Sequence, residues 1–89
     1  MVKHLKISGL VQGVGYRVSM GQKARELGVT GWVRNRSDGG VEAVIQGSPE
    51  ILETMIAWAK RGPISANVER VEISETTGEF SEFSMRPTQ

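Results

Sequence analysis

The sequence has no cysteine, only one histidine and only three prolines among its 89 residues. Without cysteine there can be no disulfide framework, thiol catalysis or thiolate metal site. The single histidine, His4, has no serine or second ligand beside it in the sequence, so we assign it no catalytic role. Carboxylates and histidines with the spacing of metal ligands are also lacking, and we therefore expect neither a metal nor a cofactor.

The sequence also lacks long apolar runs and a large net charge. No segment approaches the roughly 18 apolar residues of a membrane span, and the opening MVKHLKIS lacks the apolar stretch of a signal peptide. The net charge of +1 is too small to make nucleic acid or an anionic membrane the default partner. We expect a cytoplasmic, soluble protein that binds neither nucleic acid nor membrane, and any anion site must be local.

The residues that are present fit one small globular unit. Hydrophobic residues make up 38% of the chain and charged residues 24%, which is ordinary for a soluble domain. A chain of 89 residues can bury one core without staples, and the sequence shows no linker or internal repeat. We therefore predict a single domain over residues 1–89.

Apolar periodicity predicts alternating strands and helices. Period-two alternation predicts strands over residues 3–11, 29–34 and 41–47 and around 71–73, with 83–85 as a short fifth segment. Helical spacing and caps predict helices from about Ser19 to Leu27 and from Pro49 to Arg61, and Asp38-Gly39 predicts a hairpin between the second and third strands. This order indicates an α+β, ferredoxin-like βαββαβ fold, an antiparallel sheet with two helices on one face.

The loop after the first strand is the best candidate for chemistry. Glycines in the run QGVGYR, residues 12–17, permit positive φ, and consecutive amides leading into a helix can form an anion-binding nest. Arg17 can close that nest with two parallel hydrogen bonds to phosphate oxygens. Spacing alone leaves open a plain glycine-rich turn followed by a surface arginine. Val18 replaces the third glycine of the dinucleotide fingerprint, and no Gly-Lys-Ser/Thr run of an ATPase is present.

Two short runs carry a family resemblance. GLVQGVGYR at residues 9–17, followed by GWVRN at residues 31–35, resembles the paired signatures of the acylphosphatases. The resemblance continues to the closing FSMR at residues 83–86 and so covers nearly the whole chain. It implies the same ferredoxin-like fold and a hydrolase that splits acyl phosphates into a carboxylate and inorganic phosphate. Tyr16 stands where the family commonly has phenylalanine, so its hydroxyl needs a partner, and Met20 stands where threonine is frequent.

The resemblance also implies residue roles. In that family the loop backbone and the arginine bind phosphate, which assigns phosphate binding to Gln12, Gly13, Val14, Gly15, Tyr16 and Arg17. The matching asparagine orients the attacking water, which makes Asn35 catalytic together with Arg17. On spacing alone, an asparagine near a hairpin is more simply a turn residue, and the resemblance reverses that interpretation.

Hydrolysis of an acyl phosphate, which the resemblance implies, needs few catalytic groups. The leaving carboxylate has a conjugate acid with a pKa near 4, so no strong general acid is required. We expect a small-molecule acyl phosphate as substrate, inorganic phosphate as product and competitive inhibitor, direct attack by water, and a monomeric protein.

Two other classes share this order of elements. An RNA-recognition module should carry paired aromatic residues on its central strands, whereas residues 3–11 and 41–47 contain none. A small-ligand regulatory domain of the same fold is not excluded by composition.

Overall fold

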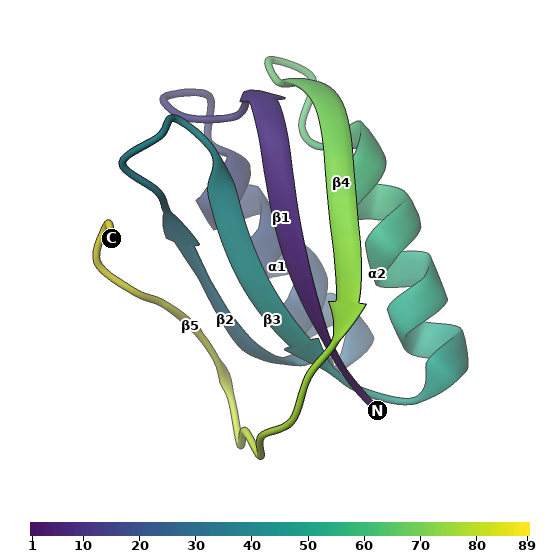
Figure 1. Ribbon diagram of the computed structural model, residues 1–89. Helices are drawn as coiled ribbons and strands as arrows, with labels where there is room; N and C mark the ends of the chain where they lie inside the picture. The colour runs from purple at the N-terminus through teal and green to yellow at the C-terminus, as the bar shows by residue number, and fades with distance from the viewer.

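The computed structural model describes all 89 residues, Met1–Gln89, as one sheet covered by two helices. The elements are β1 (Val2–Leu10), α1 (Tyr16–Leu27), β2 (Thr30–Asn35), β3 (Val41–Gln46), α2 (Pro49–Arg61), β4 (Asn67–Glu75) and β5 (Phe83–Met85). Figure 1 shows both helices behind the sheet, on the same face, with the opposite face open. The ferredoxin-like βαββαβ fold of the α+β class is confirmed.

The sheet is mixed, which corrects the expectation of a purely antiparallel one. Its strand order is β4-β1-β3-β2-β5, and every pair is antiparallel except β2 with β5, which is parallel. After β4 the chain crosses the lower end of the sheet and returns along the free edge of β2 in the same direction (Figure 1). The long connection, rather than any local pattern, sets this orientation.

The helix boundaries follow from their caps. Gly28 ends α1 in the left-handed conformation, with its amide donating to the carbonyls of Ala24 and Arg25, as predicted. Ser48 caps α2 by accepting from the amide of Ile51, and Pro49 is the first helical residue. Helix α1 begins at Tyr16 rather than at the predicted Ser19 because Gly15 acts as the N-cap.

The core lies between the sheet and the helices, and it contains both residues that differ from the family pattern. The Tyr16 hydroxyl donates to the carbonyl of Ala59 at 2.8 Å, so it has the partner that its burial demands. Burial raises the pKa of this hydroxyl, which remains a donor. Met20 is fully buried, and its side chain therefore belongs to the core. Helix α2 contributes Leu52, Met55 and Ala59 to the core, and Ile56 packs against it partly buried.

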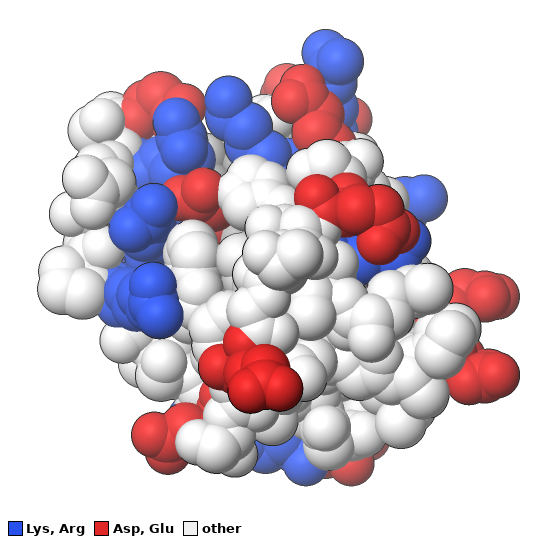
Figure 2. Space-filling model, turned by 60° about the horizontal axis from the view of Figure 1, so that its bottom comes forward, with Lys and Arg blue, Asp and Glu red and all other residues white.

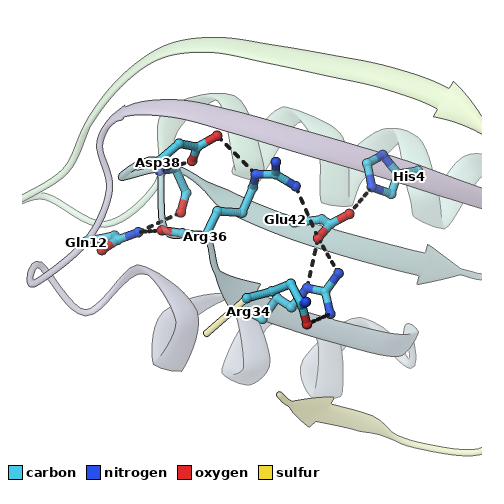
Figure 3. Close-up of polar contacts among 8 residues, drawn as sticks. His4, Gln12, Arg34, Arg36, Asp38 and Glu42 are labelled. Carbon is cyan, nitrogen blue, oxygen red and sulfur yellow. Dashed lines mark hydrogen bonds and ion pairs between the residues drawn. The ribbon is translucent and has the colours of Figure 1, made fainter. Parts of the chain in front are cut away.

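The open face of the sheet carries an ion-pair network centred on Glu42, which is only 8% exposed. His4 Nε2 donates to one carboxylate oxygen at 2.6 Å, and Arg34 Nε donates to the other at 2.8 Å (Figure 3). Burial alone would raise the pKa of Glu42, but the hydrogen bonds from His4 and Arg34 outweigh it and hold the pKa below its ordinary value. The network accounts for His4 without a catalytic role.

Candidate active site

The connection between β1 and α1 contains two glycines in the left-handed region. Gly13 has φ 74° and Gly15 has φ 79°. A Cβ atom at either position would meet nothing within 4 Å, so the backbone conformation, and not a lack of space, favours glycine there. The loop reaches its shape only because these two positions can adopt positive φ.

This shape leaves a run of backbone amides free. None of the hydrogen bonds made by turns, loops and caps is donated by an amide of residues 12–18. Three of these amides, those of residues 16–18, lie in the first turn of α1, where amides have no intrahelical acceptor. The helix dipole adds partial positive charge at the same end. Together these donors form the kind of cradle that binds an oxyanion such as phosphate.

Arg17 is the second residue of α1 and is partly exposed. It takes part in none of the ion pairs of the structure, whereas Arg34 and Arg36 are both paired with carboxylates. Helical side chains lean toward the helix amino terminus, so the side chain of Arg17, in the first turn of α1, leans toward the loop that precedes the helix. Its guanidinium has no protein partner and is available to an anion.

Asn35 ends β2 and contains an unusual atom. Its Oδ1 is the one buried side-chain nitrogen or oxygen in the structure that has no hydrogen-bond partner. The turn role considered from the sequence belongs instead to Asp38, whose Oδ1 accepts from the amide of Gly40 at 2.9 Å. A buried acceptor without a partner costs about 1–3 kcal/mol, so a folded protein retains one only rarely. A ligand or water is the natural partner for this oxygen.

Topology brings the loop and Asn35 to the same end of the sheet. Both β1 and β2 run antiparallel to β3, so they point the same way, and their last residues, Leu10 and Asn35, lie at the same end of the sheet. The side chain of Gln12 joins the two segments: its Nε2 donates to the carbonyls of Arg36 at 2.7 Å and Gly40 at 2.8 Å (Figure 3). The sequence predicted only phosphate binding for Gln12, and no local pattern indicated these two hydrogen bonds.

The candidate site does not coincide with a surface hollow. The hollows are lined by other residues, one of them by Lys6, Arg36, Asp38 and their neighbours. A phosphate held by amides at a helix end needs hydrogen-bond donors more than depth, so the free donors, and not these hollows, define the candidate site. No three or more histidine, aspartate or glutamate side chains lie close enough together to hold a metal ion.

Charge on the surface is mixed. Figure 2 shows basic side chains most closely grouped at the left and upper left of the face it draws, with others at its margins, and acidic side chains scattered over the whole face. Arg34 and Arg86 both stack on Trp32, with their Cζ atoms 4.8 and 4.5 Å from the ring centroid. None of the helices has the length and apolar character needed to cross a bilayer.

Comparison with known proteins gives one consistent result. Residues 3–85 match the family model described as Acylphosphatase. The chain is 59% identical over 83 residues to the acylphosphatase of Thiobacillus denitrificans, covering 93% of each chain. It is 61% identical over 70 residues to that of Thermococcus kodakarensis, covering 79% of this chain and 77% of the relative.

Solved structures agree. The structure of an acylphosphatase from Coxiella burnetii matches with a TM-score of 0.91 at 40% identity, covering 96% of this chain and 90% of the other. The signature runs, the fold and the relatives all point the same way, and the chain belongs to the acylphosphatase family, the enzymes that hydrolyse acyl phosphates.

Proposed function

We propose that this enzyme cleaves the carboxyl-phosphate bond by direct attack of a water held by Asn35 on a phosphate bound by Arg17 and the backbone of residues 12–17. The proposal rests on three kinds of group that lie at the same end of the sheet and have no hydrogen-bond partner in the protein. They are the free loop amides, the guanidinium of Arg17 and the buried side-chain oxygen of Asn35. The phosphate and the attacking water can supply a partner for each of them.

The phosphate is bound by geometry and charge. Loop amides donate to its oxygens, and the guanidinium of Arg17 gives two parallel hydrogen bonds. Phosphoryl transfer spreads negative charge over the equatorial oxygens in the transition state, so donors that are already in place stabilise it without reorganising. The loop and Arg17 thus supply most of the electrostatic stabilisation.

The water is held by the other segment. Asn35 Oδ1 accepts a hydrogen bond from the water, which fixes its orientation and directs a lone pair toward phosphorus. The new bond forms between water oxygen and phosphorus as the bond from phosphorus to the acyl oxygen breaks. The carboxylate leaves without protonation, and a water proton passes to a phosphate oxygen of the substrate. No protein base is required in this scheme.

The direct test is phosphate release from acetyl phosphate in the presence of a chelator. We expect full turnover with the chelator, and far slower release from a phosphate monoester, because an alkoxide leaves much less readily than a carboxylate. Loss of activity on chelation would contradict the metal-free scheme. Absence of any phosphate release would favour the regulatory-domain interpretation instead.

Inorganic phosphate is expected to bind the same cradle. It should inhibit competitively and raise the melting temperature, because an anion that binds only the native state stabilises it by mass action. At ten times the dissociation constant the stabilisation is about 1.4 kcal/mol, a shift of roughly 5–10 °C for a domain of this size. Chloride at matched ionic strength is the control, and an equal shift with chloride would argue against a phosphate cradle.

We further propose that residues 1–89 act as one monomeric domain in the cytoplasm. One sheet and one connected core support the single unit. Sedimentation at micromolar concentration tests the monomer, and cell fractionation tests the compartment.

A further inference from the structure

Gln12 occupies the start of the phosphate loop but directs its side chain elsewhere. Its Nε2 donates to two backbone carbonyls, of Arg36 at 2.7 Å and of Gly40 at 2.8 Å (Figure 3). A glutamine amide nitrogen has two donor hydrogens, and this geometry uses both. Arg36 directly follows Asn35 in the sequence, so the side chain connects the loop to the residue beside the one that is proposed to hold the water.

The β2–β3 hairpin does not depend on this link for its own shape. The amide of Arg36 donates to the carbonyl of Gly40 at 2.9 Å, and Asp38 Oδ1 accepts from the Gly40 amide at 2.9 Å. The carboxyl-terminal residue adds a further bond, from the amide of Gln89 to the carbonyl of Asn35 at 3.1 Å. The hairpin is therefore closed without Gln12, and the contribution of Gln12 concerns how the hairpin and the loop lie relative to each other.

No other polar contact joins these two segments. Among the side-chain hydrogen bonds, those of Gln12 alone connect residues 11–18 with residues 35–40. The backbone hydrogen bonds of turns and loops include none between the two ranges. One side chain thus provides the hydrogen-bonded link between the phosphate cradle and the strand end that carries Asn35.

We infer that Gln12 is a positioning residue, which keeps a loop-bound phosphate in line with the water on Asn35. This inference rests on the proposed function and adds a role for a side chain whose backbone alone had been assigned to phosphate binding. In-line attack is sensitive to distance, and a misplacement of about 1 Å can cost about 100-fold in rate. The cradle itself is local to the loop and the first turn of α1, so phosphate affinity does not depend on the link.

The first experiment replaces Gln12 with methionine, which has similar length but no donor. For Gln12→Met we expect kcat to fall about tenfold or more while the phosphate dissociation constant changes less than about twofold. The assay is run well below the melting temperature, so that any loss of stability does not reduce the folded fraction. Gln22→Met, a glutamine on the exposed side of α1, is the matched control and should leave kcat unchanged.

A double-mutant cycle with Asn35 separates positioning from a purely structural role. If Gln12 acts by aligning Asn35, then Gln12→Met should reduce kcat little further in the Asn35→Ala background. A structural role would reduce kcat by the same factor in both backgrounds and would overturn the inference. If Gln12→Met does not fold, Gln12→Asn keeps the amide but shortens its reach, and the same expectations apply.

The cycle also distinguishes the two proposals. If Asn35→Ala lowers kcat but Gln12→Met does not, only the positioning role is overturned. If Asn35→Ala itself retains full turnover, the water-holding role fails and the positioning role fails with it.

Discussion

Replacing Arg17 with lysine is expected to lower kcat/KM about 100-fold or more while the protein stays folded. Lysine keeps the positive charge but cannot give two parallel hydrogen bonds to a phosphate, and loss of one preorganised donor costs about 10²–10³ in rate. The guanidinium makes no ion pair in the structure, so its replacement removes no internal charge partner. Steady-state kinetics on acetyl phosphate, with circular dichroism on the same sample, measure both parts.

A second arginine controls for the substitution itself. Arg61 lies at the exposed end of α2, and Arg61→Lys should leave kcat/KM within about twofold of the parent. The phosphate-dependent rise in melting temperature should shrink in Arg17→Lys and persist in the control. Near-normal turnover in Arg17→Lys would sink the role assigned to this side chain.

Replacing Asn35 with alanine is expected to separate binding from chemistry. Because Asn35 orients the water and contributes little to the cradle, Asn35→Ala should lower kcat by about 100-fold or more with phosphate affinity nearly unchanged. Isothermal titration with phosphate and initial-rate kinetics on one preparation give the two quantities. Asn67→Ala, at an exposed position at the start of β4, is the control that should leave both unchanged.

Stability provides an independent readout for the same variant. The Asn35 oxygen makes no hydrogen bond to another part of the protein, so removing it breaks no internal hydrogen bond. We therefore expect the melting temperature of Asn35→Ala to equal or exceed that of the parent. A residue needed for the turn would behave in the opposite way, losing on the order of 1 kcal/mol with unchanged turnover per folded molecule. That outcome would oblige us to assign the water to another group.

Local patterns predicted most of the fold. The alternation in β1, β2 and β3 and the caps at Gly28 and Ser48 each depend on residues close together in the sequence, and each was predicted to within a few residues. The start of α1 was placed three residues too late, because the residues up to Arg17 were assigned to the glycine-rich loop. Tyr16 lies four residues before Met20 on the same buried face of the helix, and Gly15 caps the helix through its left-handed conformation. The parallel pairing of β5 depends on the path of a long connection, which no local pattern encodes.

The candidate site was predictable in its parts but not in its arrangement. The glycine-rich run and the resemblance pointed to Arg17 and Asn35 as separate residues. The register of β2 against β3 decides which carbonyls meet Gln12, and burial decides that the Asn35 oxygen has no partner. Both depend on packing between segments far apart in the chain, so they emerge only from the folded structure.

The strand order has a consequence for self-association. An outermost strand presents unpaired backbone groups on which another molecule can build, and this is a common route to aggregation. Here one edge is β4, which is mostly exposed and carries several charges along its length: Glu69, Arg70, Glu72 and Glu75. The other edge is β5, which is only three residues long. The charges on β4 and the shortness of β5 both disfavour pairing with another molecule, because neither edge strand is long and uncharged.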